Sequence, residues 1–345
     1  MDNKTFYASL STKYRPQTFE EVCSQQSIIT ILKQQLQKKN YTNCYAFCGP
    51  SGCGKTTIAR IFGTAINNGK GEIIEVDGAS NNGVDNIRNI IEEANSRCID
   101  GAEYKIFIID ECHMITTAGW NAFLKTIEEP PKYSIFMFCT TNPEKMPATI
   151  NNRVMKFNLS KIDTKLIRQR LEYICEQEEF TNYDDACDYI SKLCQGGMRD
   201  GIALLEKAAN YSTDLSIDNV LDALGDFSYD SFFNLTGDLL NQDEGNVLLT
   251  INNYFNQGRD LKLFVDQYLD FALDLAKYCL YNDISYVKIP ANLDNRCKGF
   301  SSIPNILDWT NKLIGKVLDI KNAIRYDINS KTTIEAMFIA ISRGI

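Results

Sequence analysis

The stretch Gly49-Pro50-Ser51-Gly52-Cys53-Gly54-Lys55-Thr56 decides how the rest of the chain is interpreted. A glycine, four variable residues and then Gly-Lys-Thr form the pattern of a phosphate-binding loop. The apolar run Cys44–Cys48 precedes the loop as a buried strand would, and apolar residues recur at helical spacing from Ile58 to Ala65. A strand, a glycine-rich turn and a helix in this order present backbone N–H groups and the positive end of a helix to phosphate. The stretch therefore predicts a nucleotide-binding site.

The residue types of this loop suit a nucleoside triphosphate. Lys55 is long enough to reach the outer phosphates, and the Thr56 hydroxyl is placed to hold Mg²⁺. The residues expected to contact the nucleotide are Gly49, Pro50, Ser51, Gly52, Cys53, Gly54, Lys55, Thr56 and Thr57.

Length and composition limit the class of protein. The chain has 345 residues, of which 44% are hydrophobic and 23% charged, which is ordinary for a soluble globular protein of two or three domains. No apolar run is long enough to span a membrane, and Met1-Asp-Asn-Lys4 does not begin a signal peptide. We therefore expect a cytoplasmic protein without membrane contact.

The cysteines and the charges exclude further classes. Twelve cysteines are scattered, several of them in apolar runs, which predicts reduced, buried thiols rather than a disulfide scaffold. The net charge is −8, and residues 1–160 carry 17 basic and 16 acidic side chains against 19 and 28 in residues 161–345. A DNA-binding protein that acts alone is usually basic, so any contact with nucleic acid must be local or shared among several chains.

Strand and helix patterns alternate through the first half of the chain. Strands are expected at residues 44–48, 72–77, 105–110, 134–140 and 154–159, with helices near 28–37, 56–68, 84–98 and 117–128. This alternation predicts an α/β domain with a mostly parallel sheet that helices cover on both faces. Ligands of such sheets bind beyond the carboxyl ends of the strands.

Polar side chains follow two of these strands. Asp110 and Glu111 end the apolar run Ile106–Ile109, where Asp110 would orient Mg²⁺ and Glu111 would polarise an attacking water. Asn142 follows the next strand and would hold that water. Solvated acids at a strand end and a turn-forming Asn-Pro are the alternative interpretations.

Four segments occur together and in order: Lys13-Tyr-Arg-Pro-Gln-Thr-Phe19, the phosphate loop, Asp110-Glu-Cys-His-Met114 and Phe123-Leu-Lys-Thr-Ile-Glu-Glu-Pro-Pro131. Together they resemble the AAA+ clamp-loader ATPases, most closely the gamma/tau subunits of bacterial DNA polymerase III. The strong motifs extend from about residue 7 to residue 210. The resemblance implies ATP with Mg²⁺ as the ligand and the cytoplasm of a bacterium or of a phage-infected host as the location.

The resemblance also implies roles for individual residues. Asn142 matches sensor 1, and Arg153 matches an arginine finger supplied to a neighbouring subunit, although Asn152 and Val154 replace the family's flanking residues. Arg199, next to Met198, matches sensor 2. Further matches are Lys125, which would face a neighbour's nucleotide, and Pro16 and Val22, which would pack on adenine. The alternatives are a surface salt bridge for Arg153 and a helix N-terminal turn for Arg199.

The expected domains are an ATPase domain at residues 1–160, a helical lid with sensor 2 at 161–212 and an all-helical collar at 213–345. Lid helices are expected near residues 164–179, 183–194 and 199–210. Collar helices are expected near 217–224, 229–240, 245–256, 261–281, 305–321 and 331–343, with an aromatic core stripe of Phe255, Phe264, Tyr268 and Phe271. The family's zinc module is replaced by the short interval Asn67–Gly71, so no zinc is expected.

These observations lead to a functional hypothesis. The chain is expected to be the ATP-hydrolysing motor subunit of a sliding-clamp loader, in a pentameric ring with other loader subunits, the clamp and primer–template DNA as partners. Arg88 is the candidate DNA contact, with a solvated helix face as the alternative. A DNA-remodelling AAA+ motor of the branch-migration helicase type is the second hypothesis, weakened by the lack of a winged-helix signature. A catalytically dead ring subunit is disfavoured by Lys55, Asp110 and Glu111.

Overall fold

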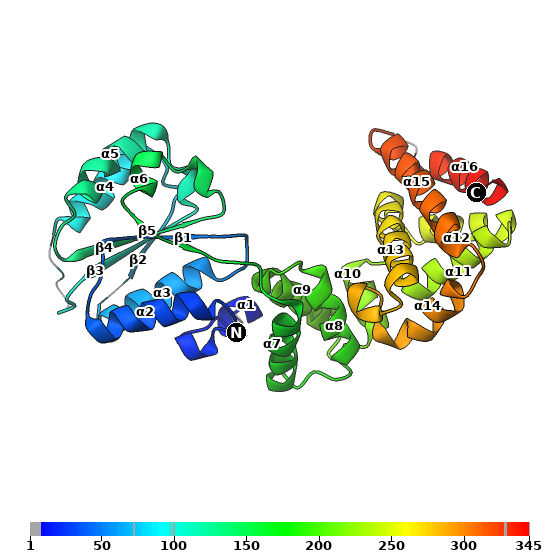
Figure 1. Cartoon of the computed structure of the whole chain (residues 1–345), viewed down its shortest axis with the longest axis horizontal. Helices are drawn as coiled ribbons and strands as arrows, with labels where there is room; N and C mark the ends of the chain where they lie inside the picture. The colour runs from blue at the N-terminus through cyan, green and yellow to red at the C-terminus, as the bar shows by residue number, and fades with distance from the viewer. Residues whose placement is uncertain (1–7, 72, 97, 99–100, 328–329, 345) are drawn as a thin grey trace, which may run out of the picture. The chain divides into compact units, whose positions relative to one another are not determined.

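The computed structural model describes residues 8–71, 73–96, 98, 101–327 and 330–344 (Figure 1). The N-terminal Met1–Lys4 stretch and Glu72, the first residue of an expected strand, lie outside the described residues. The chain forms two compact units, one of Met1–Arg170 with Cys194–Ala203 and one of Leu171–Leu193 with Leu204–Ile345. The domain boundaries expected at residues 160 and 212 remain a prediction.

The first unit contains a parallel sheet of five strands among its described residues. The strands are β1 (Cys44–Cys48), β2 (Ile73–Asp77), β3 (Lys105–Asp110), β4 (Ser134–Thr140) and β5 (Met155–Asn158). Their order is β2-β3-β4-β1-β5, and every pairing is parallel. The strand β1 therefore lies between two strands that come later in the chain. The α/β fold predicted from the sequence is confirmed.

Helices cover both faces of this sheet, as Figure 1 shows. One face carries α2 (Gln26–Lys38) and α3 (Lys55–Ile66), and the other carries α4 (Val84–Ala94), α5 (Thr117–Glu128) and the short α6 (Ala148–Asn151). Alternate side chains of β1 point to opposite faces of the sheet. Tyr45 and Phe47 pack with α2 and α3, whereas Ala46 packs with α4 and α5. Burial on both faces explains why the strands are almost continuously apolar.

Short helical turns connect these elements. They are α1 (Leu10–Lys13), η1 (Phe19–Glu21), η2 (Cys112–Met114) and η3 (Pro143–Lys145). Both η2 and η3 follow directly on the carboxyl ends of strands, β3 and β4. They turn the chain sharply and leave polar residues at that edge of the sheet.

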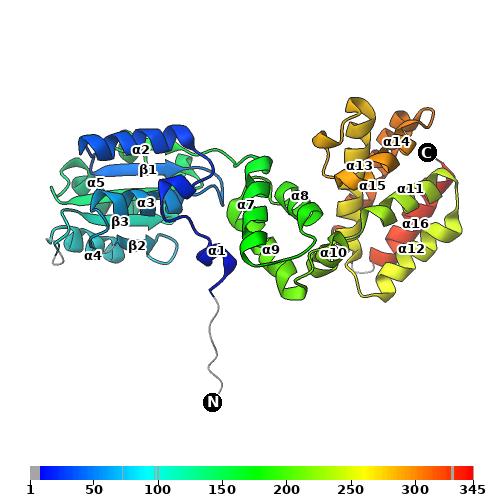
Figure 2. The same ribbon diagram turned by 90° about the horizontal axis from the view of Figure 1, so that it is seen from below.

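The remaining elements are helical. They are α7 (Thr164–Gln177), α8 (Asp184–Leu193), α9 (Met198–Tyr211), α10 (Ile217–Leu224), α11 (Tyr229–Leu240), α12 (Glu244–Asn256), α13 (Leu261–Tyr281), α14 (Asp294–Ser301), α15 (Ile306–Ile324) and α16 (Ser330–Arg343), with the turns η4 (Ile284–Tyr286) and η5 (Ala291–Leu293). The helices α7 and α9 each begin in the first unit and end in the second, and the others lie in the second unit. Figures 1 and 2 both show α13 and α15 side by side. The helix α14 was not expected, because only Cys297 is buried on it and its sequence has little apolar periodicity.

The aromatic stripe of α12 and α13 is only partly core. Phe264, Tyr268 and Phe271 are buried in the core of the second unit, as expected. The expectation is wrong for Phe255, which is 49% exposed and has the Lys331 ammonium 4.4 Å from its ring centroid. The cation covers part of an aromatic face that the core does not.

The cysteines behave as small apolar side chains. None of the twelve, all of which lie in described residues, forms a disulfide, and most are buried. Burial raises the pKa of the Cys44 thiol to about 12, so this thiol stays protonated. No helix within the described ranges combines the length and the apolar character needed to cross a bilayer.

Candidate nucleotide-binding site

The phosphate loop is shaped by its glycines. Gly52 and Gly54 have φ of +70° and +99°, a region that side chains rarely adopt. A β-carbon on Gly52 would lie 2.9 Å from the Cα of Gly197, and the Met198 N–H donates to the Gly52 carbonyl over 3.1 Å. The loop thus rests against the turn that begins α9. This contact brings Arg199, predicted as sensor 2, to the same pocket as the loop.

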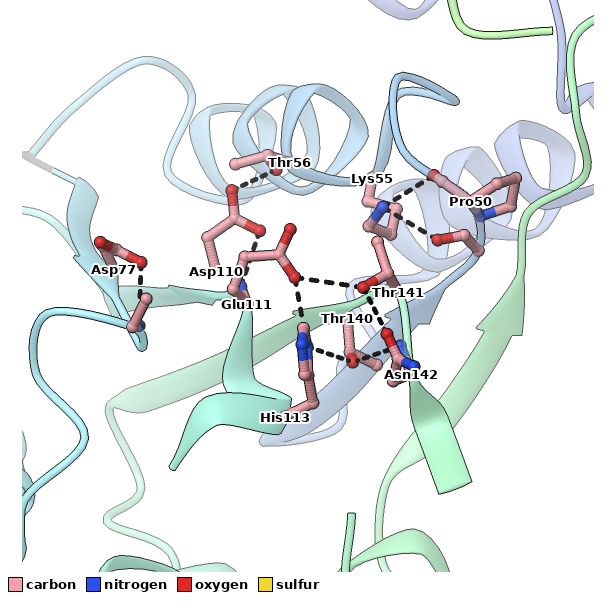
Figure 3. Close-up of polar contacts among 12 residues, drawn as sticks. Pro50, Lys55, Thr56, Asp77, Asp110, Glu111, His113, Thr140, Thr141 and Asn142 are labelled. Atoms are coloured by element: carbon pink, nitrogen blue, oxygen red, sulfur yellow. Dashed lines mark hydrogen bonds and ion pairs between the residues drawn. The ribbon is translucent and has the colours of Figure 1, made fainter. Parts of the chain in front are cut away.

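Lys55 closes the loop on itself. Its side chain is buried, and Nζ donates to the carbonyl oxygens of Gly49 and Pro50 over 2.9 and 2.8 Å (Figure 3). These bonds satisfy an ammonium group that would otherwise be desolvated without partners. Gly49 and Pro50, which were predicted to contact the nucleotide, therefore accept hydrogen bonds from Lys55 in this structure and do not line the pocket.

Thr56 and Asp110 meet although 54 residues separate them. The Thr56 hydroxyl donates to Asp110 Oδ2 over 2.8 Å, and Asp110 Oδ1 accepts from the Glu111 N–H over 3.0 Å. A hydroxyl and a carboxylate oxygen are hard ligands of the kind that Mg²⁺ takes together with nucleotide phosphates. The two residues predicted to hold Mg²⁺ are thus brought together in a suitable arrangement.

Glu111 stands in an unusual backbone conformation at the end of β3. Its φ is +44°, in the left-handed region, which is uncommon for a non-glycine residue and directs attention to function. Its Oε2 lies 3.2 Å from His113 Nδ1 and 3.4 Å from Thr141 Oγ1. Thr141 Oγ1 lies closer to Asn142 Oδ1, to which it donates over 2.8 Å, so Thr141 contacts both Glu111 and the predicted sensor 1 (Figure 3).

A pocket of about 340 Å³ opens between these elements, inside the first unit. Its lining contains most of the residues predicted to bind nucleotide, including Pro16 and Val22 for the base. The predicted residues on the lining are Pro16, Val22, Ser51, Gly52, Cys53, Gly54, Lys55, Thr56, Thr57, Asp110, Glu111, Met198 and Arg199. Asn142 lies behind Glu111 rather than on the lining.

Sequence reasoning missed two basic groups of the pocket, Arg15 and Arg170. Arg15 donates from Nε to Thr57 Oγ1 over 3.3 Å, and Arg170 donates to the Tyr14 carbonyl over 2.9 Å. Burial lowers the pKa of the Arg15 guanidinium, and the nearby Arg60 acts in the same direction. Arg15 belongs to the Lys13–Phe19 segment that supported the family resemblance, but the sequence did not indicate that its side chain lines the nucleotide pocket. Cationic groups gathered in one pocket favour an anionic ligand.

Three predicted residues lie elsewhere on the first unit. Arg153 donates to the Thr149 carbonyl over 2.7 Å and pairs with Glu128 Oε1 at 2.9 Å, on a side chain that is 41% exposed. Lys125 is exposed on α5, the helix that also carries Glu128. Arg88 is exposed on α4 and lies 3.2 Å from Asp85. Their roles remain predictions, because each would act on a partner.

Known DNA polymerase III subunits are similar in sequence to this chain. Residues 71–163 match the family model described as DNA polymerase III, delta subunit. The chain is 34% identical over 294 residues to DNA polymerase III subunit tau of Bacillus subtilis, covering 79% of this chain and 52% of that protein. Against DNA polymerase III subunit gamma/tau of Mycoplasma genitalium the identity is 31%, covering 79% and 49%.

The chain is similar to the gamma and tau subunits of bacterial DNA polymerase III. This finding confirms the resemblance drawn from the four sequence segments. The chain spans about half the length of the curated relatives it matches.

Solved structures show the fold independently. The Thermotoga maritima RuvB Holliday junction branch migration motor superposes with a TM-score of 0.52 at 17% identity, covering 66% of this chain and 79% of that chain. At this identity the likeness shows the fold alone and nothing about activity.

Proposed function

We propose that the chain is the ATP-hydrolysing motor subunit of a sliding-clamp loader, which opens the clamp and places it on primer–template DNA. The observation that carries the proposal is the meeting of Lys55, Thr56, Asp110 and Glu111 at one pocket in a chain similar to the gamma and tau subunits. The branch-migration hypothesis has only the fold in its favour, since the RuvB likeness is 17% identical.

Each residue of the pocket has a defined task in this proposal. The N–H groups of the loop and Lys55 bind the phosphates, for which Lys55 exchanges the carbonyls of Gly49 and Pro50 for phosphate oxygens. Bound Mg²⁺ would neutralise phosphate charge, held through Thr56 and Asp110. Glu111 accepts a proton from the attacking water, and Asn142 helps to orient it.

Charges that develop on the phosphoryl group need cations around the nucleotide. Arg199 supplies one from the turn that packs on Gly52. Arg153 and Lys125 would act on the nucleotide of a neighbouring subunit. Arg153 would first have to leave both Glu128 and the Thr149 carbonyl. An ion pair between half-exposed side chains contributes only about 0–1 kcal/mol. The pair is therefore a small obstacle to an action in trans.

The partners are proposed as a pentameric ring of loader subunits, a sliding clamp and primer–template DNA, in the cytoplasm of a bacterium or a phage-infected host. Arg88 is exposed on α4 and would contact a DNA phosphate. The nearly balanced charge of residues 1–160 agrees with a DNA surface shared among subunits. Zinc is not part of the proposal.

ATP turnover by the purified chain, with and without its loader partners, tests the proposal. We expect Mg²⁺-dependent hydrolysis that Lys55→Ala abolishes together with ATP binding. Glu111→Gln should bind ATP and lower turnover by about 100-fold or more, because a positioned general base contributes about 10²- to 10⁴-fold. Glu92→Gln, an exposed change on α4, is the matched control. Normal turnover by Glu111→Gln would contradict the assignment.

The nucleic-acid substrate separates the two hypotheses. Primer–template DNA together with the cognate clamp should stimulate the ATPase of a clamp loader. Stimulation by a four-way junction without a clamp would favour a branch-migration motor instead. Native mass spectrometry of the chain expressed with its genomic neighbours would give the stoichiometry of the ring.

A further inference from the structure

His113 is the single histidine of the chain, and the sequence assigned it no role. It stands on η2, two residues after Glu111, with a side chain that is only 11% exposed. Its Nδ1 lies 3.2 Å from Glu111 Oε2 and 3.2 Å from Thr140 Oγ1 (Figure 3). His113 does not line the nucleotide pocket. A nearly buried imidazole directed at the proposed general base calls for an explanation.

The Glu111 carboxylate favours one position of the imidazole proton. A bare Nδ1 lone pair 3.2 Å from a carboxylate oxygen would be repelled by it, whereas an N–H at Nδ1 would be attracted. Thr140 Oγ1, at 3.2 Å from the same nitrogen, can donate or accept and so suits either tautomer. The carboxylate therefore favours a neutral ring with its proton on Nδ1.

Two series of contacts connect Glu111 to Asn142. One passes through the Thr141 hydroxyl, which lies 3.4 Å from Glu111 Oε2 and 2.8 Å from Asn142 Oδ1. The other passes through His113 and the buried Thr140, whose Oγ1 accepts from the Asn142 N–H over 3.0 Å. The general base and sensor 1 are thus held in one closed network at the ends of β3 and β4.

The network leaves the carboxylate usable. Among the described residues, both contacts of the Glu111 carboxylate are made by Oε2. Figure 3 shows the second oxygen directed away from His113 and Thr141. One oxygen is thereby anchored while the other remains able to accept a proton from water. The left-handed backbone at Glu111 aims the side chain at the anchor.

We propose that His113 is a positioning residue, which fixes the Glu111 carboxylate beside Asn142 through its Nδ1–H and so determines the rate of hydrolysis without contacting the nucleotide. The inference rests on the proposed function, because it assumes that Glu111 is the general base. A displacement of about 1 Å at a reacting group can cost about 10²-fold in rate.

Kinetic variants test this role. His113→Phe keeps a ring but removes the donor, so kcat should fall by about 10- to 100-fold while the Kd for ATP stays within about twofold. His113→Asn keeps an N–H near the position of Nδ1 and should recover most of the rate. In a Glu111→Gln background, His113→Phe should cause no further loss, since the histidine acts only through the glutamate.

Thr141→Val removes the second anchor and should lower kcat by a smaller factor, about 3- to 10-fold. Thr126→Val, on α5, is the matched control for losing a hydroxyl and should keep the rate of the wild type. Equal losses in His113→Phe and His113→Asn, an unchanged or higher kcat in His113→Phe, or additive losses with Glu111→Gln would overturn the proposal.

Imidazole NMR provides a test that does not depend on ATP turnover. Because the chain has one histidine, its two ¹⁵N signals are unambiguous. We expect a proton on Nδ1 in the wild type and a shift towards the Nε2–H tautomer in Glu111→Ala. A chain without ATPase activity that shows this shift would contradict the proposed function but keep the contact. An unchanged tautomer in Glu111→Ala would overturn the inference even if ATP is hydrolysed.

Discussion

Adding a single methyl group at Gly52 should change the shape of the phosphate loop and thereby lower its affinity for ATP. In Gly52→Ala the new β-carbon would lie 2.9 Å from Gly197 Cα and 3.2 Å from the Gly197 carbonyl carbon. Ordinary contact begins at 3.4 Å, so the loop or the turn before α9 must move by about 0.5 Å, the difference between 3.4 and 2.9. Both neighbours are backbone atoms, which cannot rotate away.

The substitution Gly52→Ala should lower both the stability of the protein and its affinity for ATP. The left-handed φ of +70° costs an alanine about 1–2 kcal/mol of stability. The displacement also misaligns the N–H groups that would hold the phosphates, and one lost hydrogen bond to a charged group is worth about 1.5–3 kcal/mol. Because each 1.4 kcal/mol is a factor of ten, ATP affinity should fall by roughly 10- to 100-fold.

Gly69→Ala is the matched control. Its φ is +77°, and a β-carbon there has no neighbour within 4 Å. Both variants should lose the stability that the left-handed φ costs, and Gly52→Ala should lose more because backbone must also move. Only Gly52→Ala should lose ATP affinity in calorimetric titrations. Wild-type affinity in Gly52→Ala, or an equal loss of affinity in Gly69→Ala, would refute the reasoning.

Three further predictions concern the neighbouring subunit, the DNA and the second unit. Arg153→Ala should keep ATP affinity and lose roughly 10³-fold in hydrolysis within the assembled complex, and a Lys55→Ala subunit should rescue it by donating an intact arginine. Arg88→Ala should weaken DNA binding for all sequences and reduce the salt dependence by about one ion, measured by fluorescence anisotropy. Tyr189→Phe should cost about 1–3 kcal/mol of unfolding free energy, because the Tyr189 hydroxyl donates to the buried Asp226 over 2.7 Å. Since burial raises the pKa of Tyr189 above its usual value near 10, the wild type should lose this stability as the pH rises above about 10.

Each of these predictions has an outcome that contradicts it. Mixed rings without rescue, or full turnover by the isolated chain, would exclude an arginine acting in trans. An unchanged salt dependence in Arg88→Ala would place the DNA surface elsewhere. For the second unit, Tyr286→Phe is the control because Tyr286 is 64% exposed. Equal stability losses in the two tyrosine variants would exclude a special role for the contact with Asp226.

The local features of the site were predictable from the sequence. The phosphate loop, the strand that enters it and the acids that end β3 depend on neighbours within a few residues, and alternating or helical apolar spacing identifies each element. Thr56 and Asp110 were expected to meet because parallel strands end at one edge of a sheet, and they do so at 2.8 Å.

The tertiary structure alone decided which side chains became neighbours at that edge. The order β2-β3-β4-β1-β5 inserts β1 between later strands and sets β4 beside β3, which brings Thr141 to Glu111 across 30 residues. The packing of the N-terminal segment brings Arg15 to Thr57 across 42 residues. Phe255 likewise follows the apolar pattern of its helix but ends outside the core. Apolar periodicity records that a residue can be buried, whereas burial itself depends on which surfaces the folded chain packs together. The contact between His113 and Glu111 likewise depends on the tertiary structure, since it requires both the turn of η2 and the neighbouring strand β4.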